Sequence, residues 1–193
     1  VTPTSGQILL DGQDITGLDI TNRANIGIRF CHSSSRCGFK GITVRDLLSL
    51  ASARISRYGR PAAISTQVGL HGARAIVERE VDATFSGGEL KRIEIAIALA
   101  RESRLSIFDE PEAGIDLWSF KNLIAVFEHL HEQNNDSIMI ISHQERILNI
   151  ADEIVIIADG RVANKGSRDE IYPLLLNEET AAPCGCCKGG NCR

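Results

Sequence analysis

The second half of the chain alternates short apolar segments with longer segments of helical periodicity. The mostly apolar runs Leu105–Phe108 and Ser137–Ile141 have the length of β-strands. The segments Glu89–Arg101 and Leu117–Asn134 repeat their apolar residues at helical spacing. Strands that are apolar on both faces are typical of a parallel sheet covered by helices, so the pattern predicts an α/β fold.

The remaining segments extend this scheme over most of the chain. We expect further strands at Gln7–Leu10, Ile26–Phe30 and Glu153–Ala158, and helices at Thr43–Ala53, Ala73–Glu80, Glu145–Ile150 and Asp169–Leu176. Asp11-Gly12 and Asp159-Gly160 predict tight turns after the first and last of these strands. The periodicity ends at about Asn177, which predicts a flexible tail.

Composition narrows the class of protein. The chain has 193 residues, of which 43% are hydrophobic, and this suits a globular domain with a sizeable core. Acidic residues outnumber basic residues by 25 to 21, so we expect no direct contact with nucleic acid. The apolar runs are far shorter than the ~20 residues of a membrane span, and no signal peptide is visible. We therefore expect a cytoplasmic protein.

Polar side chains follow two of the expected strands. Asp109 and Glu110 come directly after Leu105–Phe108, and the carboxyl ends of parallel strands are where α/β folds bind ligands. Asp109 could hold Mg²⁺ through oxygen, and Glu110 could polarise a water that attacks a phosphate. The alternative is that two acids simply end a strand in solvent. His143, after Ser137–Ile141, could hydrogen-bond a terminal phosphate or be a partly buried histidine with a local partner.

A glycine pair precedes the helical segment Glu89–Arg101. Ser86 is a good N-cap and Glu89 follows it at capping-box spacing. Gly87 and Gly88 let the backbone approach an anion closely, where the helix presents free N–H groups and its positive end. The segment therefore suits phosphate binding, or else a tight turn that only caps the helix.

Six cysteines occur, and four of them crowd the end of the chain. These four are Cys184, Cys186, Cys187 and Cys192. They offer enough thiolates for a metal or cluster site, although their spacing matches no common zinc pattern. The alternative is a disordered tail with free thiols, as in a reducing cytosol.

Taken together, the motifs resemble those of the ABC-type ATPases in order and spacing. Phe85–Arg92 resembles the signature motif, Leu105–Glu110 the Walker B strand, Ala113–Asp116 the D-loop and Ser142-His143 the switch histidine. The resemblance spans about Gly6 to Gly166. It implies the P-loop NTPase fold of the ABC class, with a parallel-sheet core and an inserted α-helical subdomain.

The resemblance also implies a role for each of these residues. Asp109 would bind Mg²⁺, Glu110 would be the catalytic glutamate and His143 the switch. The working unit would be a head-to-tail dimer in which a second ATPase subunit completes each ATP site. The residues that meet ATP or the partner across that dimer would be Ser86, Gly87, Gly88, Glu89 and Asp116.

Within the family, two segments are most like the ATPase of the Suf iron–sulfur-assembly system (SufC). They are Phe85–Arg92 and His143–Leu148, whereas Asp109-Glu110-Pro111 is commoner in transporter ATPases. The resemblance implies an ATP-hydrolysing subunit that acts on Suf scaffold proteins in Fe–S cluster assembly. One alternative is the nucleotide-binding subunit of an ABC transporter, peripheral to the membrane and docked on membrane subunits. Another is a truncated, non-catalytic remnant.

The chain departs from the family pattern at two places. No Gly-x-x-x-x-Gly-Lys-Ser/Thr phosphate loop (Walker A) occurs, so we expect an N-terminally incomplete copy that is inactive alone. Cys31-His32 stands where the family has the Q-loop glutamine.

These motifs divide the chain into four expected parts. Residues 1–32 would be the rest of the N-terminal core and 33–84 the Q-loop region with the helical subdomain. Residues 85–176 would form the signature, Walker B and switch core, and 177–193 the cysteine-rich tail.

Overall fold

The computed structural model describes residues 3–32, 41–51, 76–82, 84–100, 103–133 and 137–176. It forms two compact units, Val1–Ser142 and His143–Arg193. The predicted tail with its four cysteines lies outside the described residues, as does most of the predicted helical subdomain. Among the described helices, none is long and apolar enough to cross a membrane.

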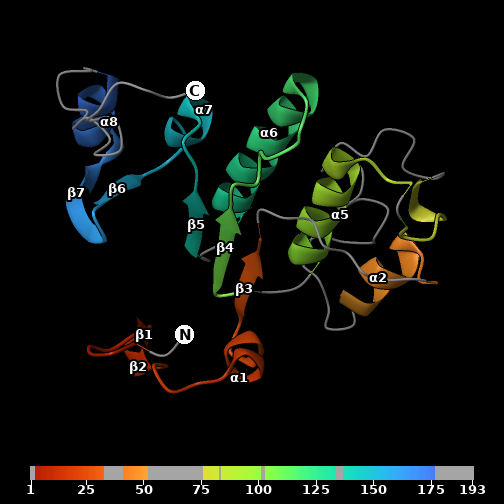
Figure 1. Cartoon of the computed structure of the whole chain (residues 1–193), viewed down its shortest axis with the longest axis horizontal. Helices are drawn as coiled ribbons and strands as arrows, with labels where there is room; N and C mark the ends of the chain where they lie inside the picture. Colours follow the sequence, from red (N-terminus) through yellow and green to blue (C-terminus); the bar gives the residue numbers. More distant parts are fainter. Residues whose placement is uncertain are drawn as a thin grey trace, which may run out of the picture. The chain divides into compact units, whose positions relative to one another are not determined.

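The first unit holds most of the secondary structure (Figure 1). Its elements are β1 (Leu9–Leu10), β2 (Gln13–Asp14), α1 (Ile20–Asn25), β3 (Ile28–Cys31), α2 (Val44–Ala51), α5 (Gly87–Leu99), β4 (Leu105–Asp109), α6 (Leu117–Gln133) and β5 (Ser137–Ile141). The second unit contains α7 (Glu145–Leu148), β6 (Glu153–Ala158), β7 (Arg161–Ser167) and α8 (Arg168–Leu176).

A three-stranded parallel sheet in the order β3-β4-β5 forms the centre of the first unit. Phe30 of β3 pairs with Ile107 of β4, which in turn pairs with Met139 of β5. Residues that pair across parallel strands point to the same face, and the next residue on each strand points to the other face. The predicted parallel sheet is thus confirmed, and β5 has the predicted bounds.

Helices α5 and α6 pack on one face of this sheet. Phe108 of β4 is 1% exposed and meets Phe127 of α6 edge to face, with ring centroids 5.0 Å apart. From β3, the guanidinium of Arg29 donates a hydrogen bond to the backbone oxygen of Ala98 in α5. Burial of the apolar side chains on this face is the main stabilising contribution in this part of the unit.

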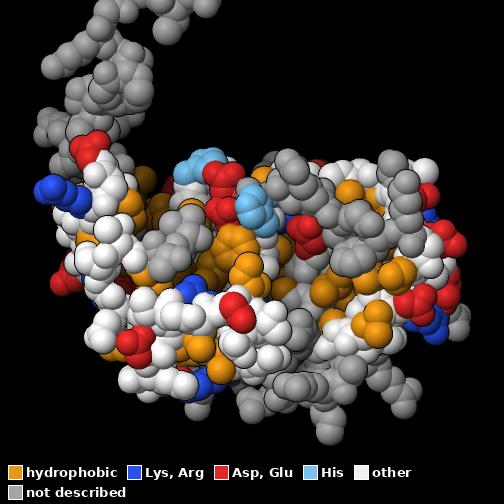
Figure 2. Space-filling model, turned by 60° about the horizontal axis from the view of Figure 1, so that its bottom comes forward, with side chains coloured by type: hydrophobic (Ala, Val, Ile, Leu, Met, Phe, Trp, Pro, Cys, Tyr) orange, Lys and Arg blue, Asp and Glu red, His pale blue; other side chains and the backbone are white. Residues whose placement is uncertain are grey.

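The opposite face of the sheet is much more open. Its apolar side chains include Phe30, Met139 and Ile141, which are 58%, 52% and 50% exposed. Figure 2 shows hydrophobic side chains, drawn orange, that lie open on the surface in that view. These side chains lie on the two strands that flank β4, and exposed apolar side chains gathered on one face are typical of interaction surfaces.

Two predicted strands lie outside the parallel sheet. The strand predicted at Gln7–Leu10 is confined to β1, Leu9–Leu10, and pairs antiparallel with β2. Glu153–Ala158, expected in the parallel sheet, instead pairs antiparallel with β7 in the second unit. The turn Asp159-Gly160 joins the two strands with φ values of 50° and 71°, as a type I′ hairpin turn requires. The return strand Arg161–Ser167 was missed because it is largely polar and exposed, so it lacks the apolar alternation of a half-buried strand.

Helix α5 begins where the sequence predicts, with a capping box. Ser86 has extended backbone angles, and its hydroxyl accepts a hydrogen bond from the backbone N–H of Glu89. The Glu89 carboxylate in turn accepts from the backbone N–H of Ser86 at 2.8 Å and from its hydroxyl at 2.9 Å. These donated hydrogen bonds hold the pKa of Glu89 below its usual value of 4.5.

The two faces of the sheet predict different mutational costs. Phe108→Ala should lower the free energy of unfolding by about 3–5 kcal/mol, because it removes a fully buried ring and leaves a cavity against Phe127. Phe30→Ala, the matched control on the open face, should lower the free energy of unfolding by less than about 1 kcal/mol. Urea unfolding followed by circular dichroism measures both. Equal costs would contradict the assignment of the buried face.

The capping box predicts a pH-dependent stability. A carboxyl group whose pKa is lowered by folding stabilises the protein above its unfolded pKa, and that stabilisation is lost as the pH falls through the folded pKa. Glu89→Gln should therefore melt below the wild type at neutral pH, and the difference should vanish at pH values well below 4.5. Ser86→Ala should lower the free energy of unfolding by about 1 kcal/mol at neutral pH, because it removes the N-cap hydroxyl of the same capping box. A difference for Glu89→Gln that stays constant down to low pH would show that its charge has no part in it.

Candidate functional site

Two carboxylates stand at the carboxyl edge of β4. Asp109 is half-buried as the last residue of the strand, and Glu110 follows it on the surface. Glu110 has φ of 43°, and its backbone N–H donates to the oxygen of Ile141 at 2.9 Å, which ties the turn to β5. A non-glycine residue in this left-handed region costs roughly 1–2 kcal/mol. Asp11 and Asp159 have similar φ values in the turns between paired strands, whereas Glu110 has this conformation at the end of a strand of the parallel sheet.

A third carboxylate, Glu112, lies buried behind this edge. It is 9% exposed, and its Oε1 accepts a hydrogen bond from the hydroxyl of Ser142 at the end of β5. Its other oxygen, Oε2, is buried and has no hydrogen-bond partner within the described part of the chain. The sequence gives no signal for Glu112, which appears there as only one more acid in a turn.

His32 directly follows the last residue of β3. Cys31, the last residue of β3, pairs with Phe108, and Asp109, the last residue of β4, pairs with Ile141 of β5. The pleat turns Cys31 and Phe108 to the helix-covered face, so it directs His32 and Asp109 to the open face. The exposed His32 ring meets Phe30 edge to face, with ring centroids 5.8 Å apart. In the sequence, this histidine is one of the two residues, Cys31 and His32, that stand where the family has a glutamine.

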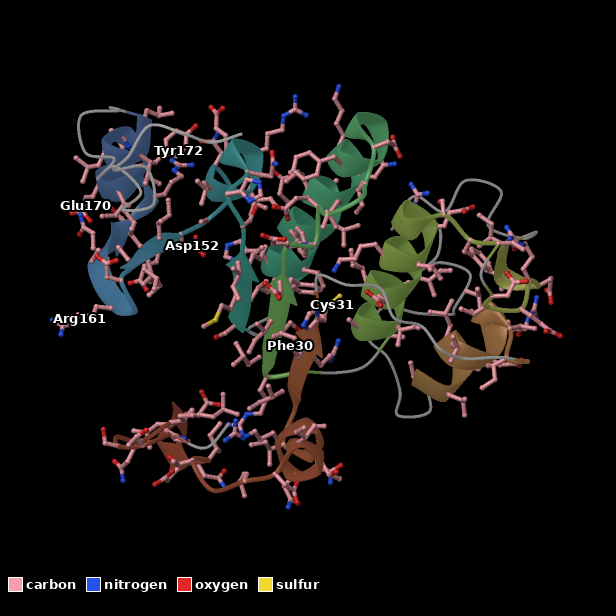
Figure 3. All side chains as sticks on the ribbon, in the orientation of Figure 1. Phe30, Cys31, Asp152, Arg161, Glu170 and Tyr172 are labelled. Carbon is pink, nitrogen blue, oxygen red and sulfur yellow. The ribbon has the colours of Figure 1, made fainter. Side chains whose placement is uncertain are left out.

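A buried lysine of α5 fixes the end of β3. Lys91 has no exposed surface, and its ammonium donates to the backbone oxygen of His32. Figure 3 shows Phe30 and Cys31 along β3. Burial raises the pKa of the Cys31 thiol to about 11, while the nearby charge of Lys91 lowers it and those of Glu94 and Asp109 raise it further. Cys31 is therefore a protonated thiol at neutral pH and a poor metal ligand.

The start of α5 lies against the segment predicted as the D-loop. A Cβ atom on Gly88 would come within 2.8 Å of the backbone oxygen of Gly114, whereas one on Gly87 would meet nothing within 4 Å. One turn further along α5, Arg92 forms an ion pair with Asp116 at 3.7 Å. The structure thus brings the predicted signature residues together with Asp116, and it explains why position 88 requires glycine.

The other predicted site residues are not brought next to the end of β4 or the start of α5 in the described part of the chain. His143 is the first residue of the second compact unit, and its ring lies 3.5 Å from the side-chain amide of Gln144. Its predicted hydrogen bond to a terminal phosphate stays a prediction. Cys184, Cys186, Cys187 and Cys192 lie outside the described residues. Within the described ranges, no group of three or more His, Cys, Asp and Glu side chains could by itself hold a metal ion.

Comparison with known proteins identifies the family. A protein-family model described as ABC transporter matches residues 1–113, which is more than half of the chain. An uncharacterized ABC transporter ATP-binding protein, MJ0035 of Methanocaldococcus jannaschii, is 32% identical over 96% of this chain and 73% of its own length. The sulfate/thiosulfate import ATP-binding protein CysA of Synechocystis is 32% identical over 88% of this chain. The methionine import ATP-binding protein MetN of Mannheimia succiniciproducens is 29% identical over 88% of this chain.

Solved structures share the fold. A bacterial Atm1-family ABC exporter with ATP bound superposes with a TM-score of 0.75 at 20% identity, over 94% of this chain and 33% of the exporter chain. The ATP-binding cassette MJ0796, a dimer bound to ADP and Pi in a post-hydrolysis state, superposes with a TM-score of 0.74 at 19% identity, over 87% of this chain and 75% of that chain.

The chain spans only 47% and 50% of the CysA and MetN relatives. The predicted fold class, a P-loop NTPase of the ABC type, is confirmed by the family match and by both structures. By its sequence match and its fold, the chain belongs to the ABC transporter family of ATP-binding proteins.

Proposed function

We propose that the chain belongs to the ATP-binding subunit of an ABC transporter, which binds ATP with Mg²⁺ and hydrolyses it as a head-to-tail dimer. The observation that supports this most is the carboxyl edge of β4. There, half-buried Asp109 and the strained, exposed Glu110 stand side by side on the strand that neighbours β3 and β5. Ligands of open α/β sheets bind outside this edge.

The groups at this edge fit a magnesium site. Carboxylate oxygens are the protein ligands that Mg²⁺ takes, and it keeps water and phosphate oxygens for its other positions. Asp109 would supply one such oxygen from the end of β4. When bound, Mg²⁺ would neutralise phosphate charge.

In this proposal, Glu110 acts on the attacking water. Its carboxylate is exposed at the edge, where the left-handed backbone and the hydrogen bond to Ile141 fix the direction in which the side chain leaves the turn. A carboxylate held there can accept a hydrogen bond from a water and orient it toward the terminal phosphate. His143 would contact the same phosphate.

The start of α5 would meet ATP bound by the second subunit. Ser86 caps a 13-residue helix, and Gly87 and Gly88 present backbone N–H groups at its positive end, which attract phosphate. The close approach of Gly88 to Gly114 and the pair between Arg92 and Asp116 join this surface to the D-loop. The start of α5 and the D-loop segment, which would both contact the second subunit, are therefore in contact with each other through α5.

The relatives favour a transporter partner over a Suf partner. CysA and MetN are named for import of sulfate or thiosulfate and of methionine, and MJ0035 for an ABC transporter. The preferred partners are thus membrane subunits of a transporter, with the ATPase at the cytoplasmic side of the membrane. The Suf assignment rests on the resemblance of Phe85–Arg92 and His143–Leu148 alone and stays a prediction.

The isolated 193-residue chain should not hydrolyse ATP. It carries no phosphate loop, whose lysine and backbone N–H groups hold the β- and γ-phosphates in P-loop enzymes. Phosphate release from ATP with Mg²⁺ by the purified chain tests this. Turnover on the order of 1 s⁻¹ or above would show that the chain needs no such loop.

A version of the chain fused to a phosphate-loop segment tests the role of Glu110. Glu110→Gln keeps the shape of the side chain but removes its charge, so turnover should fall by about 10²–10³-fold while ATP binding persists. The variant should accumulate as an ATP-bound dimer, visible by size-exclusion chromatography with light scattering. Asp109→Asn should lose Mg²⁺-dependent binding and give no such dimer. If Glu110→Gln turns over like the parent fusion, the β4 edge is not the catalytic edge.

A further inference from the structure

We propose that Arg79 is a positioning residue for the start of α5, and that it acts through the ring of Phe85. The inference rests on the proposed function, in which Ser86, Gly87 and Gly88 face ATP bound by a second subunit. It adds a residue that lies upstream of the predicted signature motif and would not itself touch the nucleotide.

Two contacts join the half-buried Arg79 to the residues just before the helix. Its guanidinium carbon lies 3.9 Å from the centroid of the Phe85 ring, the arrangement of a cation–π interaction. Its Nη2 also donates a hydrogen bond of 2.7 Å to the hydroxyl of Thr84. Phe85 is 6% exposed and directly precedes the N-cap Ser86. A planar guanidinium can stack on a ring and donate in its own plane at once, so one side chain restrains two successive residues.

Thr84 extends this restraint to the turn before the helix. Its hydroxyl donates to Oδ1 of Asp82 at 2.6 Å, and its backbone N–H donates to the same oxygen at 3.0 Å. These hydrogen bonds, and to a smaller extent the charge of Arg79, hold the pKa of Asp82 below its usual value of 3.8. The Asp82 carboxylate is therefore charged at neutral pH and accepts both bonds.

The backbone of Arg79 is itself anchored to the segment that begins α2. Its oxygen accepts a hydrogen bond from the backbone N–H of Val44 at 3.1 Å. The backbone N–H of Val81 donates to the oxygen of Ile42 at 2.9 Å. Val44 and Val81 are 0% and 1% exposed, so these backbone contacts belong to the core. Figure 1 shows this segment, drawn yellow, beside α2. Arg79 thus reaches from a fixed backbone to the start of α5.

The charge of Arg79 also acts at the start of the helix. The hydrogen bonds from Ser86 lower the pKa of Glu89 most, and the positive charges of Arg79 and Arg92 lower it further. Arg79 therefore offsets the negative charges of Asp82 and Glu89, which would otherwise repel a phosphate at the start of α5. A neutral side chain at position 79 would lose both the stacked cation and this compensating charge.

ATP-driven dimer formation tests the proposal. Every protein is the full chain fused to the phosphate-loop segment and carries Glu110→Gln, so that bound ATP is not consumed. Size-exclusion chromatography with light scattering gives the ATP concentration at which half of the protein is dimeric. A fluorescent ATP analogue, at protein concentrations too low for dimers, gives the affinity of the monomer for nucleotide. Circular dichroism confirms that each variant is folded.

Arg79→Gln should raise the ATP concentration needed for dimer formation by about tenfold and leave the nucleotide affinity of the monomer unchanged. Arg79→Lys keeps the charge but not the planar fork, so it should restore part of the loss. In the Phe85→Leu background, Arg79→Gln should cost about threefold or less, because only the effect of its charge remains. The matched control Arg45→Gln removes an exposed arginine of α2 that pairs with Glu78, and it should dimerise like the parent.

The outcomes separate this inference from the proposed function. If Arg79→Gln dimerises at the same ATP concentration as the parent, or if Arg45→Gln is weakened equally, the inference is wrong while the proposed role of α5 stands. An equal loss from Arg79→Gln with and without Phe85→Leu would show that Arg79 does not act through the ring, and a parallel loss of nucleotide affinity by the monomer would also overturn the inference. A parent that forms no ATP-dependent dimer overturns the proposed function, and the inference fails with it.

Discussion

Strand β4 is paired with β3 on one side and with β5 on the other, and the arrangement of the first unit depends on this double pairing. Because the strands pair in parallel, the carboxyl ends of all three lie at the same edge of the sheet. Burial of Phe108 against Phe127 then decides which face of β4 meets the helices. Because side chains alternate along a strand, that one packing contact also directs Asp109 to the open face.

Helix α5 connects the parts of the site that are distant in sequence. Its capping box fixes where the helix starts, Gly88 lets that start touch Gly114, and the buried Lys91 reaches the end of β3. One helix therefore contacts both the segment around Gly114 and the end of β3, the strand next to β4.

The open face of the sheet holds both apolar and chemical groups. Phe30, Met139 and Ile141 remain about half exposed there, and Asp109 lies at the carboxyl end of the middle strand. Exposed apolar side chains gathered on one face are typical of a surface that contacts another part of a protein or a partner.

The sequence by itself determined the local chemistry and most of the elements. Apolar runs, the Ser86 cap and the Asp-Gly turns depend only on neighbouring residues, so the strands at 105–109 and 137–141, helix α5 and both turns could be predicted. The order of motifs predicted the fold class. The exposed polar strand Arg161–Ser167 carried no such local signal.

Only the tertiary structure decided which distant residues stand together. The pairing of Cys31 with Phe108 follows from the register between β3 and β4, which are more than seventy residues apart in sequence. The burial of Lys91 and Glu112 and the left-handed backbone of Glu110 likewise arise from packing and strand pairing. Register and burial are set by the free energy of the whole unit, and so no local pattern of residues reveals them.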